Sequence, residues 1–317
     1  MYELYITNRE KTYKPVIEGD VTWETTRMGQ PGKLSFNVVN DKVIDFQEGN
    51  PVIFRVNKQN IFFGFVFSKE RDKEQIIQVT AYDQLRYLKN KDTYVYENKK
   101  ASDVINNIAN KFLLQTGTVE DTGYVIASRI QDNKTLFDII YDSLDLTLMN
   151  RGKMYVLYDD FGKLTLKDVE TMKVPDLVVG DYNGQNFSYK TDIDTDTYNK
   201  VKLHRKNEKT GKTEEYELLH EENIKKWGVL LYFEDVDEKT NIKAKADAIL
   251  KMKNKKKRTL QLNEILGDTR VRAGSSVMTL LEDIGDISVA QYMLVEKCKH
   301  VFSNDEHWMT LDLRGDI

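Results

Sequence analysis

The stretch Ile61-Phe62-Phe63-Gly64-Phe65-Val66-Phe67 is apolar on both sides of an extended chain. Alternate side chains of a β-strand point to opposite faces. A strand of a small antiparallel barrel needs only one apolar face, because the other normally meets water. A neighbouring domain, or another copy of the chain, must therefore cover the outside. We predict that this strand is a subunit or domain interface, formed by Ile61, Phe62, Phe63, Phe65, Val66 and Phe67.

The composition is that of a globular protein. The chain has 317 residues, of which 40% are hydrophobic and 31% charged, enough for two or three domains with buried cores. The net charge of -4 argues against bulk electrostatic binding to nucleic acid. No apolar run approaches the roughly 18–20 residues of a membrane span. One cysteine, Cys298, excludes an internal disulfide framework and suits a reducing cytoplasm.

The first 95 residues are predicted to form a β region. Val52–Val56 and the apolar stretch flank the turn Asn57–Asn60 and read together as a hairpin. Lys33–Val38 and Ile76–Tyr82 alternate apolar and polar residues, which is typical of half-buried strands.

Helical patterns then interrupt the strands, and residues 96–185 are predicted to form a small α/β module. Ser102 is a suitable N-cap for a helix that stops near Gly117. Thr135 can cap a second helix, with Asp138 in the capping-box position. A hairpin at Met154–Val169 follows the second helix.

Residues 186–317 are predicted to form a second β region. Several short predicted strands at this spacing indicate a sandwich or barrel: Asn199–Arg205, Thr213–Leu218, Leu260–Leu266, Ser276–Leu281, Gln291–Phe302 and Trp308–Leu313. A helix near residues 240–257 is expected to be embedded in this region. The predicted fold class is α+β, mainly β.

No catalytic, cofactor-binding or metal site is predicted. Asp192–Asp196 resembles the start of a calcium-binding loop, but Thr197 and Leu203 stand where that loop needs glycine and glutamate. If Phe302 pairs with His307 across a hairpin, the rings of His300 and His307 are not expected to converge on one ion. The spacings of zinc sites and phosphate-binding glycine loops do not occur.

The basic run Lys251–Arg258 has two interpretations. It could contact nucleic acid or an acidic partner surface. It could instead be the C-terminal end of a helix, where cations complement the helix dipole. The second interpretation is favoured, because the rest of the chain is acidic and no aromatic residues interleave with the lysines.

Six groups of residues, in the same order along the chain, resemble the XkdQ family of PBSX-type prophage tail proteins. The groups are Ala81–Tyr94 (AYDQLRYLKNKDTY), Thr122–Tyr124, Thr135–Asp138, Asn199–Leu203, Lys226–Gly228 and His307–Leu313. Together they extend over nearly the whole chain. That family is similar in fold to the tail hubs of phages T4 and Mu.

The resemblance implies a structural hub of a contractile phage tail or tail-like bacteriocin. Each chain of a homotrimer would supply two tube-like β-barrel domains, residues 1–95 and 186–317, around the inserted module at residues 96–185. The ring would join the sixfold tail tube to the threefold central spike and continue the channel. The implied partners are the tail tube, spike and tape-measure proteins and the wedge proteins of the baseplate.

The resemblance also implies no catalytic residues, no cofactor, no membrane and no sequence-specific nucleic acid. Assembly is expected in the bacterial cytoplasm, and the final location is the tail of a virion or of an extracellular tail-like particle. Two alternatives stay open: a tail-associated cell-wall hydrolase, and a binding module for a cell-wall polysaccharide. The second would need clustered aromatic residues, whereas Trp23, Trp227 and Trp308 are scattered along the chain.

Overall fold

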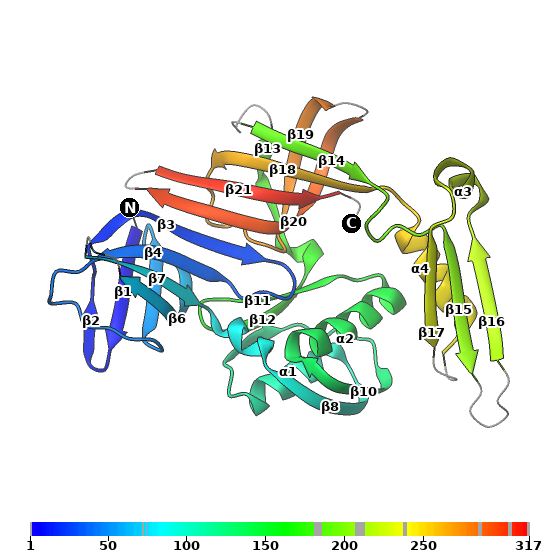
Figure 1. The fold of residues 1–317 in the computed structure, drawn as a ribbon, viewed down its shortest axis with the longest axis horizontal. Coiled ribbons are helices and arrows are strands. Elements are labelled where there is room, and N and C mark those ends of the chain that lie inside the picture. The colour runs from blue at the N-terminus through cyan, green and yellow to red at the C-terminus, as the bar shows by residue number, and fades with distance from the viewer. Residues whose placement is uncertain are drawn as a thin grey trace. The chain divides into compact units, whose positions relative to one another are not determined.

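The computed structural model describes residues 2–71, 73, 75–180, 186–206, 213–236, 240–284, 287–303 and 306–315. Strands dominate these residues and helices are few (Figure 1), which confirms the predicted α+β, mainly β class. The chain forms two compact units, residues 1–188 with 260–317 and residues 189–259. No helix in the described part of the chain is long and apolar enough to cross a membrane.

One large sheet runs through the first unit and includes thirteen strands of the described residues. The strands are β1 (Tyr2–Asn8), β2 (Lys11–Tyr13), β3 (Ile17–Thr26), β4 (Lys33–Val39), β5 (Pro51–Val56), β6 (Gln59–Arg71), β7 (Ile76–Tyr82), β13 (Lys173–Gly180), β14 (Asn186–Asp192), β18 (Lys257–Leu266), β19 (Ser276–Ile284), β20 (Ile287–Ser303) and β21 (Glu306–Arg314). Their order is β14-β18-β21-β20-β3-β4-β7-β6-β5-β1-β2, and β13 joins through β19, which pairs with β20.

The strands from the two ends of the chain are hydrogen-bonded to each other in this sheet. Lys297–Phe302 of β20 pairs antiparallel with Val21–Thr26 of β3, so β3 in blue lies beside β20 in orange-red (Figure 1). The compact units consequently group the chain differently from the expected domains at residues 1–95, 96–185 and 186–317. Strands after residue 260 share a sheet with the first strands, and residues 189–259 stand apart as a unit of their own.

The N-terminal part of the sheet curls around a core. The rings of Phe54 in β5 and Phe302 in β20 lie with their centroids 5.0 Å apart, although four strands separate β5 from β20 in the sheet order. Leu34, Phe36 and Val38 of β4 are buried while their neighbours are not, as their alternation predicts. The same core contains Leu4, Ile6, Val21, Trp23, Val52, Phe62, Val66, Val79 and Ala81.

The hairpin between β5 and β6 is tighter than predicted. Only Asn57 and Lys58 form the turn, and both have positive φ angles, 48° and 66°. This left-handed pair matches the right-handed twist of the two strands. Gln59 pairs with Val56 in the ladder. The expectation of a four-residue turn was therefore wrong, because two of those residues extend β6.

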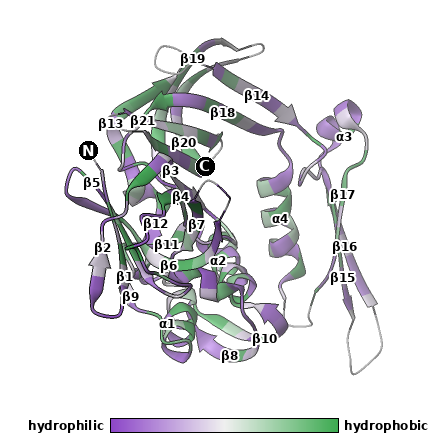
Figure 2. Ribbon diagram, turned by 60° about the vertical axis from the view of Figure 1, so that its left-hand side comes forward, coloured by the Kyte–Doolittle hydropathy of each residue, from purple (hydrophilic) through white to green (hydrophobic). Residues whose placement is uncertain are grey.

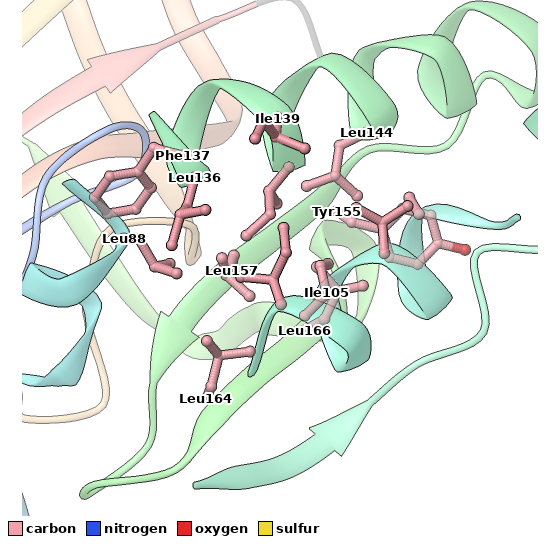
Figure 3. Packing of buried hydrophobic residues seen from close by; sticks show 14 of the residues in the cluster. Leu88, Ile105, Leu136, Phe137, Ile139, Leu144, Tyr155, Leu157, Leu164 and Leu166 are labelled. Atoms are coloured by element: carbon pink, nitrogen blue, oxygen red, sulfur yellow. The ribbon is translucent and has the colours of Figure 1, made fainter. Parts of the chain in front are cut away.

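A module of helices and short strands is inserted between β7 and β13. Its elements are η1 (Gln84–Lys89), β8 (Lys91–Lys99), α1 (Ala101–Lys111), β9 (Thr116–Val119), β10 (Ile126–Thr135), α2 (Leu136–Arg151), β11 (Tyr155–Asp159), β12 (Leu164–Asp168) and η2 (Val169–Met172). Its own core lies between the helices and the β11–β12 hairpin and includes Leu88, Ile105, Leu136, Leu157 and Leu166 (Figure 3).

One of the two predicted helix caps is confirmed. Thr135 caps α2, since its hydroxyl accepts a hydrogen bond from the Asp138 N–H at 3.1 Å and the Asp138 carboxylate accepts one from the Thr135 N–H at 3.2 Å. Ser102 is not a cap but lies inside α1. The cap residue is Lys100, whose N–H donates to the Asp103 carboxylate at 2.9 Å.

The second unit, residues 189–259, is a three-stranded sheet with helices. It contains β15 (Lys200–Lys206), β16 (Thr213–Leu219), α3 (Glu221–Trp227), β17 (Leu231–Val236) and α4 (Ile242–Lys253), with β15 in the centre of the sheet. Figure 2 shows hydrophobic and hydrophilic residues alternating along α4. The apolar side of α4, which includes Ala246 and Ile249, packs with Val201 and Leu203 of β15. This helix is shorter than the predicted residues 240–257.

Candidate assembly interface

The apolar stretch lies in β6, and its two faces have different surroundings. Phe62 and Val66 are buried in the core of the curled sheet. Phe63, Phe65 and Phe67 alternate with them and lie half-buried on the outside of the sheet. We call these three side chains the outer ribbon. Ile61 packs against the core instead, because the ladder with β5 is irregular between Asn60 and Phe62.

The chain itself covers part of the outer ribbon. The Phe63 ring lies 5.8 Å from that of Phe161, which belongs to the turn between β11 and β12. Tyr87 of η1 lies 6.5 Å from Phe65 and 6.1 Å from Phe67, and the Arg86 guanidinium stands over the Phe67 ring at 5.4 Å. The inserted module therefore shields one side of the ribbon, and the remaining surface of these rings is open.

Gly64 lets the neighbouring strand approach this part of β6. A Cβ atom at Gly64 would overlap the backbone carbonyl of Tyr82 in β7 and the ring of Phe62. Since backbone atoms cannot rotate away, Gly64→Ala is expected to lower the free energy of unfolding by about 1–3 kcal/mol. Ser68→Ala, at an exposed position of the same strand, should change it by less than about 0.5 kcal/mol. Equal midpoints of the two variants in urea unfolding would contradict the close approach.

A half-buried arginine lies where three parts of the first unit meet. Arg272 precedes β19, and its guanidinium stacks over the ring of Tyr158 in β11 at 4.0 Å and lies 5.9 Å from Trp23 of β3. It donates a hydrogen bond to the backbone carbonyl of Asp159 at 2.9 Å. The next residue, Ala273, donates its N–H to the Thr25 hydroxyl of β3 at 2.9 Å. Arg272 thus connects the module to both β regions.

Two buried carboxylates accompany Arg272. Asp83 accepts hydrogen bonds from the N–H groups of Gly32 at 2.8 Å and Leu85 at 3.0 Å. Burial and the nearby Asp159 carboxylate hold the pKa of Asp83 well above its ordinary value. Burial also raises the pKa of Asp159 to about 6 and lowers that of Arg272. The guanidinium compensates carboxylates that would otherwise be buried without a partner charge.

Asp159 also positions the turn of the inserted module that covers part of the outer ribbon. The Asp159 carboxylate accepts a hydrogen bond from the Gly162 N–H at 2.6 Å and so closes the turn that presents Phe161 to Phe63. Sequence reasoning missed Arg272, Asp83 and Asp159. Asp83 falls within one of the conspicuous residue groups, but a lone arginine in a polar turn carries no pattern that could have singled it out.

The prediction about the histidines was half wrong. Phe302 does pair with His307, and His300 lies opposite Met309. The two imidazoles nevertheless meet, with His300 Nδ1 2.9 Å from His307 Nε2. The reason is that diagonal neighbours on one face of an antiparallel pair are within reach of long side chains. Among the described residues, no group of three or more His, Cys, Asp or Glu side chains could hold a metal ion.

Asp192–Asp196, the segment that resembles the start of a calcium-binding loop, forms an ordinary polar turn. The Asp192 carboxylate accepts hydrogen bonds from the N–H groups of Asp194 at 2.6 Å and Thr195 at 3.0 Å. Its charge is also compensated by Lys190 at 2.9 Å. The carboxylate is therefore already satisfied by the chain itself.

Solved structures that are similar to this chain include prophage tail proteins and a component of a type VI secretion system. It is similar over 98% of its length to a prophage MuSo2 tail protein of Shewanella oneidensis, covering 98% of that chain with a TM-score of 0.71 and 12% identity. It is also similar to the Escherichia coli c3393 protein, over 98% of this chain and 76% of that one, with a TM-score of 0.56 and 9% identity. That protein is a type VI secretion component with structural similarity to the T4 tail proteins gp27 and gp5.

Two relatives from Bacillus subtilis (strain 168) match almost end to end. The uncharacterized protein YqbQ is 30% identical over 99% of this chain and 96% of its own length. The phage-like element PBSX protein XkdQ is 29% identical over 99% of this chain and 97% of its own length, which confirms the resemblance predicted from the sequence. The family model described as YQBQ-like matches residues 21–314. The chain therefore belongs to the YqbQ-like family.

Proposed function

We propose that this chain is the structural hub of a contractile phage tail or tail-like particle. Three copies form a ring that continues the channel of the sixfold tail tube and seats a threefold central spike. The observation that carries the proposal is the fold, a largely β chain of the kind found in prophage tail proteins and in a protein similar to T4 tail components. Its partners would be the tube, spike, tape-measure and baseplate wedge proteins.

The arrangement of strands supports a wall built from several copies. The pairing of β3 with β20 joins both β regions of one chain into one continuous sheet. A closed threefold ring needs heterologous contacts, in which different patches of neighbouring copies meet. The open side of the outer ribbon, Phe63, Phe65 and Phe67, supplies one apolar patch of the required kind. In this proposal each chain contributes two barrel-like β regions, which gives six around the channel.

The channel must pass a tape-measure protein, and in a phage also DNA, without holding it. Cations in the wall would bind phosphate groups, so the basic run Lys251–Arg258 is proposed to face away from the channel. The run includes the end of α4 and the start of β18, and Lys251, Lys255 and Lys256 are exposed there. Lys253 is instead paired with Asp196 at 2.5 Å.

The structure favours this role over a cell-wall hydrolase. A hydrolase of polysaccharides needs two carboxyl groups that can reach the glycosidic bond. Asp83 and Asp159 have the raised pKa values expected of a general acid, but both are buried and hydrogen-bonded to backbone N–H groups. They can stabilise the fold and cannot contact a polymer from that position.

The stoichiometry of the complex tests the proposal. Co-expressed with the tube and spike proteins of its own particle, the chain should purify as a complex that contains three copies of 37.0 kDa each. Multi-angle light scattering combined with native mass spectrometry would count them. One copy per complex would contradict a threefold hub. A structural role would also be contradicted if the purified chain, but not a mock preparation, cleared a peptidoglycan zymogram.

A further inference from the structure

Two buried side chains and a half-buried one form a row where β20 meets β3 and β21. Cys298 and His300 lie on β20 and His307 lies on β21. Cys298 Sγ is 3.0 Å from His300 Nε2, and His300 Nδ1 is 2.9 Å from His307 Nε2. His300 is fully buried, and its Nε2 also lies 2.9 Å from the carbonyl oxygen of Val271.

These contacts limit where the ring hydrogens can lie. A carbonyl oxygen only accepts, so His300 Nε2 carries a hydrogen and donates it to Val271. In the neutral ring His300 Nδ1 then accepts, and its hydrogen-bond partner, His307 Nε2, must carry the donated hydrogen. A proton added to His300 Nδ1 would require His307 to change tautomer, so that its Nε2 accepts instead of donating.

The surroundings oppose any added charge. Trp23 of β3 stacks on the His300 ring at 5.0 Å, and Phe302 stacks on the His307 ring at 4.2 Å. Burial is the main reason that the pKa of His300 is lowered to about 3 and that of His307 to about 4. Three other titratable groups lie nearby: Asp268 favours the charged rings, Arg272 opposes charge on His300, and the Cys298 thiol is kept neutral by burial.

We propose that the His300–His307 pair is a proton-sensitive latch that holds the β20–β21 hairpin against β3. In the closed form the neutral pair is favoured, because a proton would place a charge between Trp23 and Phe302 at a site where His300 has no exposed surface. When the strands separate, both rings reach water and can take up protons. Acid therefore favours the open form and loosens the connection between the N-terminal and C-terminal β regions. The latch follows from the single chain and does not depend on its proposed place in a tail.

The direction of the pH effect follows from linkage. In the open form both rings have the ordinary histidine pKa of about 6.5, whereas the closed form binds a proton only near pH 3–4. The closed form is thus fully stable above about pH 6.5 and loses stability as the pH falls below it. When the pH falls from 7 to 5, each histidine that stays neutral in the closed form raises the equilibrium constant for opening about 25-fold.

The thiol of Cys298 can report this opening. It is the only cysteine of the chain, it is buried, and it pairs with Thr25 of β3. The full-length protein would be labelled with a pyridyl disulfide reagent, and the rate divided by that of the urea-unfolded chain at the same pH. This ratio should rise at least about 25-fold from pH 7 to pH 5 in the wild type.

Two variants make the test specific. In His300→Gln/His307→Gln the amides can still hydrogen-bond but do not titrate, so the ratio should change by less than about threefold. His204→Gln, in the separate unit of residues 189–259, should keep the full rise. A flat ratio in the wild type, or an undiminished rise in the double variant, would overturn the latch. If the double variant does not fold, the ring ¹⁵N chemical shifts of the wild type provide the test. The rings of His300 and His307 should both be neutral at pH 5. Imidazolium signals from these rings at that pH would refute the proposal.

Discussion

Replacing Arg272 with methionine is expected to lower the free energy of unfolding by about 3–5 kcal/mol at pH 7. Methionine keeps much of the apolar stem of arginine but removes a positive charge that compensates Asp83 and Asp159. Those buried carboxylates would then lose that compensation. The contact over Tyr158 and the hydrogen bond to the Asp159 carbonyl would also be lost.

Arg270 offers a control two residues away. It forms ion pairs with Asp176 at 2.8 Å and Asp268 at 2.6 Å, but its own side chain is half exposed. Such pairs contribute little, so Arg270→Met should cost no more than about 1 kcal/mol. Urea unfolding of both variants, followed by a signal from residues 1–188 and 260–317, would measure the difference. Equal losses of unfolding free energy in the two variants would show that Arg272 does not compensate the buried carboxylates.

The cost of losing Arg272 should also depend on pH. Burial raises the pKa of Asp159 to about 6 and raises that of Asp83, so protonation removes the uncompensated charges. A raised acid pKa means that stability is present at low pH and is lost as the pH rises through that value. The gap between wild type and Arg272→Met is therefore expected to shrink at pH 5. A gap that widens on acidification would contradict this charge balance.

Phe65→Asp is expected to abolish assembly of the hub. Phe65 is in the middle of the outer ribbon, and an aspartate there would place a charge in an apolar contact between copies, with a desolvation cost of several kcal/mol. Permanent interfaces are large and rich in apolar side chains, so they do not tolerate such a charge. Light scattering of the co-expressed complex should then detect no trimers.

The same substitution must be separated from a folding defect, because Phe65 also contacts Phe63 and Tyr87 of its own chain. Circular dichroism should show a folded chain with a somewhat lower unfolding midpoint. Ser68→Asp adds the same charge at an exposed position of β6 and should leave trimers intact. A trimer of unchanged mass from Phe65→Asp would rule out the ribbon as the contact between copies.

Local features of the fold could be predicted from the sequence, whereas the long-range ones could not. Alternation gave the buried face of β4 and, from Phe62 onward, that of β6, and Thr135 with Asp138 marked the start of α2. A period of two says which face of a strand is buried, but it does not say which strand lies beside it. The pairing of β3 with β20, across more than 270 residues, was therefore beyond a sequence argument.

The candidate site shows the same division. The outer ribbon was evident from its composition, but its partial cover by Phe161 and Tyr87 depends on how the inserted module packs. Arg272 has no periodic or motif context, so only the fold reveals its place between Tyr158 and Trp23. The meeting of His300 with His307 needed the diagonal geometry of the hairpin, and the register alone suggested the opposite.

Averaged cryo-electron microscopy of the intact particle tests the central claim most directly. We expect three copies of this chain in one closed ring at the junction of tail tube and spike, with the outer ribbon against a neighbouring copy and Lys251–Arg258 away from the bore. A particle with a single copy, or with the chain remote from that junction, would contradict the role of a structural hub.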